Sequence, residues 1–291
     1  MYNNVENLIR YAKEQKLSLW QVILENECRL TGKTEEEVFQ QLDRRYKVMF
    51  RSVNKALEEP QETVGNLVTG MAYRQYLYSQ KDDSLCGAEL NYVMAMALSA
   101  SEVNAAMGKI CAAPTAGSCG ILPAVLAGVE RKYKLDRKIT LQGLLTASGI
   151  GTIVVKNATV SGAEGGCQAE CGVAAAMAAA AVVEMRGGTP DMAANAVSFT
   201  LMNCMGLICD PIAGLVQLPC AQRNASQSIN ALLSADLALA GMESPIPADE
   251  VIEAMYKVGK KLPFELKETA LGGIAATPAG KRIEESIFTQ K

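Results

Sequence analysis

Hydrophobic residues near the N-terminus recur at intervals of three and four, as they do on one face of a helix. The positions are Val5, Leu8, Ile9 and Ala12 in a first segment, and Val38, Leu42, Tyr46 and Met49 in a second. Thr34 and Glu37 have the spacing of a capping box, which predicts that the second helix begins after Thr34. We therefore expect residues 1–60 to form a helical arm that ends at Pro60 and packs on a core or on a partner.

From about Ala88 onward, the pattern changes to long segments of alanine, methionine, glycine and valine with few charged residues. Such segments are typical of helices that are buried on most sides. Glycine, proline and polar residues interrupt them in four links, at residues 111–120, 156–166, 186–191 and 209–220. In the third link, Thr189 is the predicted N-cap of a helix whose first residue is Pro190.

No segment shows a convincing alternation of polar and apolar residues, which a half-buried strand would show. Residues 151–155 are compatible with a strand, but the high alanine content favours helices. We predict an all-α fold in one large domain over residues 1–291, with a buried core rich in alanine and glycine. The core is expected at residues 88–280, beside the helical arm at 1–60.

Charge and hydropathy exclude several classes of partner. The net charge is −3 and no basic block is present, which argues against nucleic acid. The N-terminus has no continuous apolar signal, and the most apolar run, residues 171–185, is shorter than the roughly 20 residues that span a bilayer. We expect a soluble, cytoplasmic protein without a membrane partner, whose nine cysteines are reduced thiols or metal ligands.

The chain contains no histidine, which restricts the chemistry that it can perform alone. A Ser-His-Asp triad, a Cys-His dyad and a histidine-rich zinc site are excluded within it. A proton must therefore be moved by lysine, carboxylate, tyrosine or thiol, or by a second polypeptide.

Three cysteines lie in links or at expected helix ends: Cys167, Cys209 and Cys220. Gly165 and Gly166 permit a tight turn before Cys167, where the start of the alanine-rich helix would stabilise a thiolate. Three soft ligands indicate an iron–sulfur cluster, or a zinc ion with one open position. Small buried hydrophobic residues are the alternative, and the cysteine spacing leaves both interpretations open.

Longer strings of the sequence resemble one family, and they occur in its order. They are APTAGSCGILPAVL (113–126), KNATVSGAEGGCQAECGVAAAMAAAA (156–181), CDPIAGLVQLPCAQRNA (209–225) and KETALGGIAATPAG (267–280). These strings are similar to the α chain of the iron–sulfur-dependent L-serine dehydratases, and the resemblance covers most of the chain.

The resemblance implies a [4Fe–4S] cluster that is held by Cys167, Cys209 and Cys220, with the fourth iron free to bind the hydroxyl of L-serine. It implies β-elimination of water, in which iron is the Lewis acid and a base removes the α-proton. The products would be pyruvate and ammonia, which suits amino acid degradation and gluconeogenesis. The remaining cysteines, Cys171 and Cys204 included, are interpreted as core residues.

Further positions of the family's strings are candidates for contact with the substrate. The small-residue loop 114–120 precedes a helix and suits binding of a carboxylate through amides and hydroxyls. Arg223 would bind the substrate carboxylate or neutralise the cluster. The substrate-binding candidates are Thr115, Gly117, Ser118, Asn157, Arg223 and Asn224, and Lys156 is the catalytic candidate.

Two departures from the single-chain members indicate the two-subunit type. The chain ends in SIFTQK without a cysteine, and it lacks the N-terminal domain with a serine- and histidine-containing motif. We therefore expect a β subunit as partner, which would carry any histidine base, so that the isolated α chain is inactive.

Other functions remain open on the sequence. A cysteine desulfidase or a threonine dehydratase would use the same elimination chemistry. A pyridoxal-phosphate enzyme would need a Schiff-base lysine, and a zinc hydrolase would need other ligands than three thiolates. The chain could also be a non-catalytic helical subunit with structural thiols.

Overall fold

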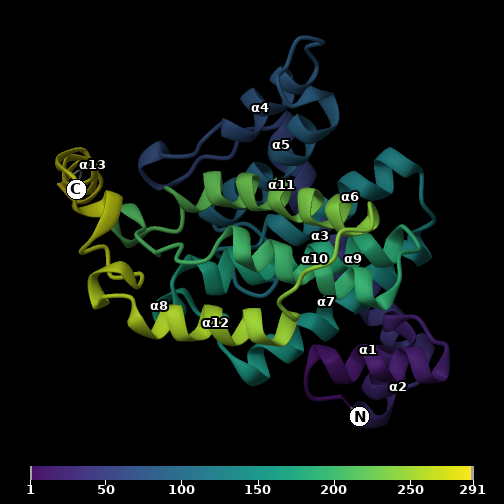
Figure 1. The fold of residues 1–291 in the computed structure, drawn as a ribbon. Coiled ribbons are helices and arrows are strands. Elements are labelled where there is room, and N and C mark those ends of the chain that lie inside the picture. Colours follow the sequence, from purple (N-terminus) through teal and green to yellow (C-terminus); the bar gives the residue numbers. More distant parts are fainter. Residues whose placement is uncertain (1, 290–291) are drawn as a thin grey trace.

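The structure is a computed structural model, and it describes residues 2–289. Over these residues the chain forms thirteen α-helices and no β-sheet, and Cys209 and Lys267 make an isolated parallel bridge. The predicted all-α fold is therefore confirmed. Helices from all parts of the sequence pack around a common core (Figure 1).

The N-terminal segment folds as its hydrophobic pattern predicts. It contains α1 (Val5–Gln15), α2 (Leu19–Thr31) and α3 (Glu35–Glu58). Thr34 caps α3, because its hydroxyl accepts a hydrogen bond from the Glu37 amide at 3.2 Å and its own amide donates to the Glu37 carboxylate at 2.8 Å. In Figure 1, α1 and α2 lie at one edge of the molecule, whereas α3 packs against α5 in the interior.

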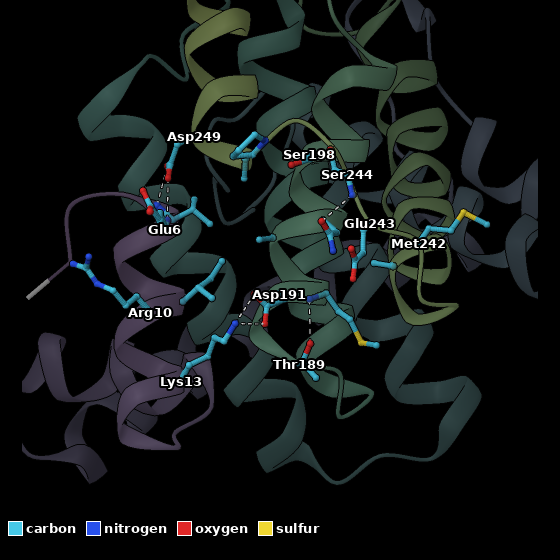
Figure 2. Close-up of a pocket in the computed structure, with 18 of the residues that line it drawn as sticks. Glu6, Arg10, Lys13, Thr189, Asp191, Ser198, Met242, Glu243, Ser244 and Asp249 are labelled. Carbon is cyan, nitrogen blue, oxygen red and sulfur yellow. Dashed lines mark hydrogen bonds and ion pairs between the residues drawn. The ribbon is translucent and has the colours of Figure 1, made fainter.

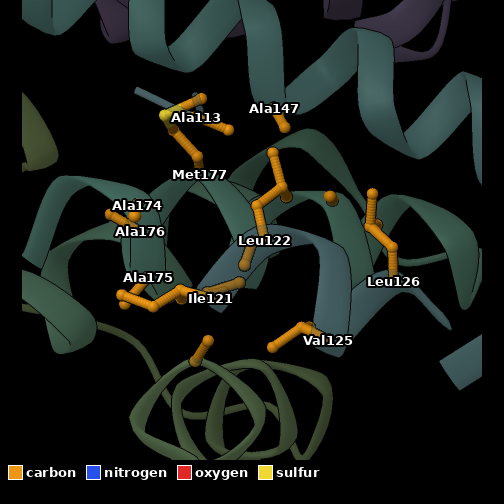
Figure 3. Packing of buried hydrophobic residues seen from close by; sticks show 14 of the residues in the cluster. Ala113, Ile121, Leu122, Val125, Leu126, Ala147, Ala174, Ala175, Ala176 and Met177 are labelled. Atoms are coloured by element: carbon orange, nitrogen blue, oxygen red, sulfur yellow. The ribbon is translucent and has the colours of Figure 1, made fainter. Parts of the chain in front are cut away.

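Helix α9 (Val173–Met185) lies at the centre, and its alanine side chains are fully buried. It packs against α6 (Ile121–Tyr133), α7 (Arg137–Asn157), α10 (Pro190–Asn203) and α11 (Cys220–Leu239). Outside these, α5 (Gly87–Ala105) packs on α6 and α11, and α4 (Met71–Ser79) packs on α5. Figure 3 shows the alanines of α9 beside Ile121 and Leu122 of α6. Small side chains let these helices approach closely, which explains the alanine-rich sequence. Residues 151–155 belong to α7 and not to a strand.

Two links contain the local structure that their sequences predict. Thr189 caps α10 by accepting the amide of Met192 at 3.2 Å, and Pro190 is the first helical residue. Before α9, a short helix α8 (Gly162–Gly165) ends at Gly166, whose φ of 77° favours glycine. Cys167 follows, and then a π-helical turn, η2 (Gln168–Gly172), continues directly into α9.

The C-terminal part of the chain forms backbone hydrogen bonds with the link that carries Cys209. It contains α12 (Ala248–Lys261), η4 (Phe264–Leu266), η5 (Gly273–Ala276) and α13 (Pro278–Thr289). Two other short turns lie earlier in the chain, η1 (Val64–Asn66) and η3 (Ile212–Gly214). The Cys209 amide donates to Leu266 O at 2.9 Å, and the Glu268 amide donates to Cys209 O at 2.7 Å. This pairing ties residues 266–268 to the candidate site.

Two helical segments among the described residues are long and apolar enough to span a bilayer, by length and composition. They are Arg137–Asn157 and Gln168–Met185. The second is longer than the run 171–185, because the π-helical turn extends α9 toward its N-terminus. Within the most apolar window of each, 67% and 94% of the residues are buried inside the protein, so packing in the core accounts for their composition.

Candidate functional site

Three buried thiols from distant parts of the chain meet in one region. Cys167 precedes the π-helical turn, Cys209 lies in the link after α10, and Cys220 is the first residue of α11. Their exposed fractions are 2%, 4% and 8%. They lie near enough that charge on Cys167 raises the pKa of both other thiols. The structure therefore brings together the three cysteines that the resemblance selects.

The three thiols differ in their electrostatic environment. The thiol of Cys171 donates to Cys167, and this interaction, together with the positive charge of Arg223, holds the pKa of Cys167 below its ordinary value despite burial. Burial is the main reason that the pKa of Cys209 is raised, and it raises the pKa of Cys220 to about 12. Cys171 is thus a neighbour of Cys167 as well as a core residue.

The donor set fits an iron–sulfur cluster. Soft thiolates are its usual ligands, and several buried thiolates beside a single arginine are costly unless a further cationic group replaces their protons. Within residues 2–289, no three or more His, Cys, Asp and Glu side chains form a group that could hold a metal ion. In a cubane each thiolate binds a different iron, so its cysteines need not converge on one point. Three cysteines that do not meet at one point can therefore still serve as ligands of such a cluster.

Arg223 links the thiols to the C-terminal segment. Its guanidinium forms an ion pair with Asp210 at 2.8 Å and donates to Ile208 O at 2.8 Å. The second Asp210 oxygen accepts the amide of Ile274 at 2.8 Å. These contacts occupy the guanidinium of Arg223 and hold it beside Cys167. Of its two predicted roles, the geometry therefore favours neutralising the charge of the thiols over binding the substrate carboxylate through two hydrogen bonds.

The loop 114–120 lies against the same region. Asn224 holds it there, since its Oδ1 accepts the Gly120 amide at 2.8 Å and its Nδ2 donates to Gly117 O at 2.7 Å and to Cys220 O at 2.8 Å. Both donor hydrogens of this fully buried amide are thus engaged with the backbone. The structure assigns Asn224 to positioning the loop beside Cys220.

Thr115 and Ser118 place two hydroxyls in this loop. Their oxygens are 3.0 Å apart, and the Thr115 hydroxyl donates to Glu170 Oε1 at 2.6 Å. Gly117 packs on the same carboxylate, because a Cβ there would lie 2.8 Å from Glu170 Oε1. The predicted substrate loop is therefore in contact with the π-helical turn that follows Cys167.

Glu170 lies in this region and was not among the site residues predicted from the sequence. It is 8% exposed, and burial is the main cause of a raised pKa for its carboxyl group. The available signal was a single carboxylate within an otherwise apolar stretch, three residues after Cys167. A π-helical turn, a feature often found at functional sites, carries this residue.

Lys156 and Asn157 lie elsewhere, at the exposed C-terminal end of α7. The Lys156 ammonium binds the Asn3 side chain, and Asn157 Nδ2 donates to Asn3 O at 2.7 Å. Across the described part of the chain, no hydrogen bond or ion pair links either residue to the thiols. Their catalytic and substrate-orienting roles stay predictions without support from the geometry.

Comparison with known proteins gives the site its context. A sequence profile described as the serine dehydratase alpha chain matches residues 14–275. The probable L-serine dehydratase alpha chain of Bacillus subtilis (strain 168) is 47% identical over 288 residues, which cover 99% of this chain and 96% of that protein. This chain belongs to the serine dehydratase alpha chain family.

Relatives of this chain occur in two lengths. The L-serine dehydratase alpha chain of Peptoniphilus asaccharolyticus is 49% identical and matches over 99% of its length. L-serine dehydratase 2 of Escherichia coli (strain K12) is 37% identical, and the match covers 94% of this chain but 61% of that protein. The family thus includes proteins with substantial sequence beyond the part that corresponds to this chain.

A separate cavity of the protein, about 850 Å³ in volume, is lined by none of the predicted site residues. It lies between α1, α10 and the segment before α12 (Figure 2). Lys13 and Asp191 form an ion pair across it at 3.1 Å, and Asp249 accepts the amides of Val5 and Glu6 at 2.9 Å. These contacts join α1 to α10 and α12, so the cavity lies at the interface between these helices.

Proposed function

We propose that this chain is the α subunit of an L-serine dehydratase, which converts L-serine to pyruvate and ammonia with a [4Fe–4S] cluster. The cluster would be held by Cys167, Cys209 and Cys220. The observation that carries this proposal is the convergence of these three buried thiols, from separate segments, beside Arg223. Full-length relatives named L-serine dehydratase alpha chain support the choice of reaction.

When bound, the cluster supplies a Lewis-acidic iron that makes the substrate hydroxyl a better leaving group. The residues of the chain prepare the site around it. Arg223 offsets negative charge at the thiols, and the start of the helical segment after Cys167 contributes its positive end. The hydroxyls and amides of the loop 114–120 are available to orient the substrate carboxylate.

The group that removes the α-proton is left to a residue other than histidine, or to a partner. We propose a β subunit as that partner, because the relatives are named alpha chains. It would complete the site with residues that this chain does not supply. The assembly would work in the cytoplasm, where the nine thiols stay reduced.

The test is to assay the chain alone and together with its β subunit, after anaerobic reconstitution with iron and sulfide. We expect equimolar pyruvate and ammonia from L-serine with both subunits, and less than a few per cent of that rate with either one. L-Threonine should react more slowly, since one extra methyl group costs about 10–200-fold in kcat/KM. Release of sulfide from L-cysteine without turnover of L-serine would instead identify a desulfidase.

A further inference from the structure

The Glu170 carboxylate has one oxygen engaged and one free. Oε1 accepts the Thr115 hydroxyl at 2.6 Å, whereas Oε2 has no hydrogen-bond donor among residues 2–289. The residue as a whole is 8% exposed. A carboxylate so far removed from water is stabilised when a cationic group binds it.

The free oxygen lies near one of the three thiols, that of Cys209. A Cβ added at Gly162 would lie 2.9 Å from Glu170 Oε2, 3.1 Å from Cys209 Sγ and 3.3 Å from Glu268 Oε2. These atoms from three segments therefore approach the same point, which only a glycine at position 162 leaves clear. Glu268 arrives there because its amide pairs with Cys209 O at 2.7 Å.

Neither of these two carboxylates has a cationic partner among the described residues. None of the ion pairs within the described residues involves Glu170 or Glu268. Arg223 is engaged by Asp210 and lies against Cys167. Burial, together with the negative charge of Glu268, raises the pKa of Glu170, and a bound cation would offset both effects.

We propose that the Glu170 carboxylate, assisted by Glu268, binds the ammonium group of the amino-acid substrate. This assignment rests on the proposed function. An amino acid with a leaving group at Cβ presents a carboxylate, an ammonium and that leaving group. The loop 114–120 suits the carboxylate and the thiols mark the position of the leaving group, so Glu170 is the group left to recognise the ammonium.

The test uses Glu170→Gln in the reconstituted complex with the β subunit and two unreactive ligands of equal size. L-Alanine carries the ammonium group, and L-lactate has a hydroxyl in its place. Equilibrium dialysis gives the dissociation constant of each. We expect the substitution to weaken L-alanine about tenfold or more, as loss of a charge-assisted hydrogen bond does, and to change L-lactate by less than about threefold.

Glu184→Gln is the matched control, because Glu184 is a carboxylate on the same continuous helical segment with a pKa raised by burial and a Thr146 donor at 3.1 Å. It should leave the ratio of the two dissociation constants unchanged. Glu268→Gln should weaken L-alanine less than Glu170→Gln does, since Glu268 is exposed. If Glu170→Gln does not fold, the Glu268 variant decides, and unchanged L-alanine binding there would overturn the proposal.

Equal losses for both ligands with Glu170→Gln would contradict ammonium binding. Retained L-alanine affinity with a lower kcat would contradict it too, and would assign Glu170 to proton transfer. Iron and sulfide content is measured in parallel, and it should match the wild type. If the wild type itself lacks L-serine turnover, the proposed function fails and this assignment fails with it. If the wild type is active but the variant does not discriminate, only the assignment fails.

Discussion

Asn224 is the side chain whose contacts hold the loop 114–120 to the start of α11. Replacing it with alanine removes three hydrogen bonds and leaves the Gly120 amide without a partner. We expect Asn224→Ala to lower the free energy of unfolding by about 2–4 kcal/mol in urea titration. Ser226→Ala, at an exposed position of the same helix, should change it by less than about 0.5 kcal/mol. Equal effects of the two would show that the loop is held by other contacts.

Glu184 gives the protein a predictable pH dependence. Burial raises its pKa above the ordinary value of 4.5, so the folded chain binds this proton more tightly than the unfolded chain does. Stability therefore increases as the pH falls through the raised pKa toward 4.5, and decreases as the pH rises again. Relative to Glu184→Gln, the wild type should gain unfolding free energy between neutral pH and pH 4.5. A constant difference across that range would contradict a raised pKa for the partly buried Glu184 carboxyl group.

Single residues were predictable where the reason was local. Thr34 and Thr189 cap helices because a hydroxyl and an amide three residues later are neighbours in any such turn. Glu170 was not predictable, because its role depends on Thr115 and Glu268, which are distant in sequence. Lys156 and Asn157 are near Cys167 in sequence, but α7 ends between them and the thiols, and the chain turns before it reaches Cys167.

At the scale of elements, α12 packs on α8 through two glycines. A Cβ on Gly259 would lie 2.7 Å from Gly165 Cα and 3.0 Å from Gly165 O. Glycine to alanine in a helix interior usually stabilises by about 0.5–1 kcal/mol, but here the contact is with backbone that cannot rotate away. We expect Gly259→Ala to destabilise by about 1–3 kcal/mol in thermal or urea unfolding.

Ala254→Gly is the matched control for Gly259→Ala, because Ala254 is an exposed position of α12. It should cost about 0.5–1 kcal/mol through helix propensity alone. Gly259→Ala and Ala254→Gly are opposite substitutions, yet both should therefore lower the free energy of unfolding. A gain in stability with Gly259→Ala would show that α12 does not pack closely on α8.

The helices were predictable from periodicity and alanine content, but the contacts between distant segments were not. Hydrophobic spacing determines which face of α3 is buried, whatever that face contacts. The π-helical turn at Gln168–Gly172 has no distinct pattern of apolar residues, so it could not be predicted from the sequence. The pairing of Cys209 with residues 266–268 also depends on long-range folding that spacing does not encode.

At the scale of the whole molecule, the fold brings three links and the C-terminal segment to one buried region. The central helices supply rigidity, and the links supply the thiols, hydroxyls and carboxylates. Composition predicted the helical core, but cysteine spacing left a metal site and buried apolar residues equally open. The resemblance to a family selected Cys167, Cys209 and Cys220, and the structure then showed that these three are neighbours.

The central claim is that these three cysteines hold a [4Fe–4S] cluster, and anaerobic iron and sulfide analysis tests it most directly. The proteins to compare are the wild type, Cys167→Ala, Cys209→Ala and Cys220→Ala, with Cys204→Ala as a control at another buried thiol. We predict about four irons and four sulfides per chain in the wild type and the control, and loss of the cluster in each of the other variants. An iron-free wild type, or a full cluster in any of those three variants, would contradict the account.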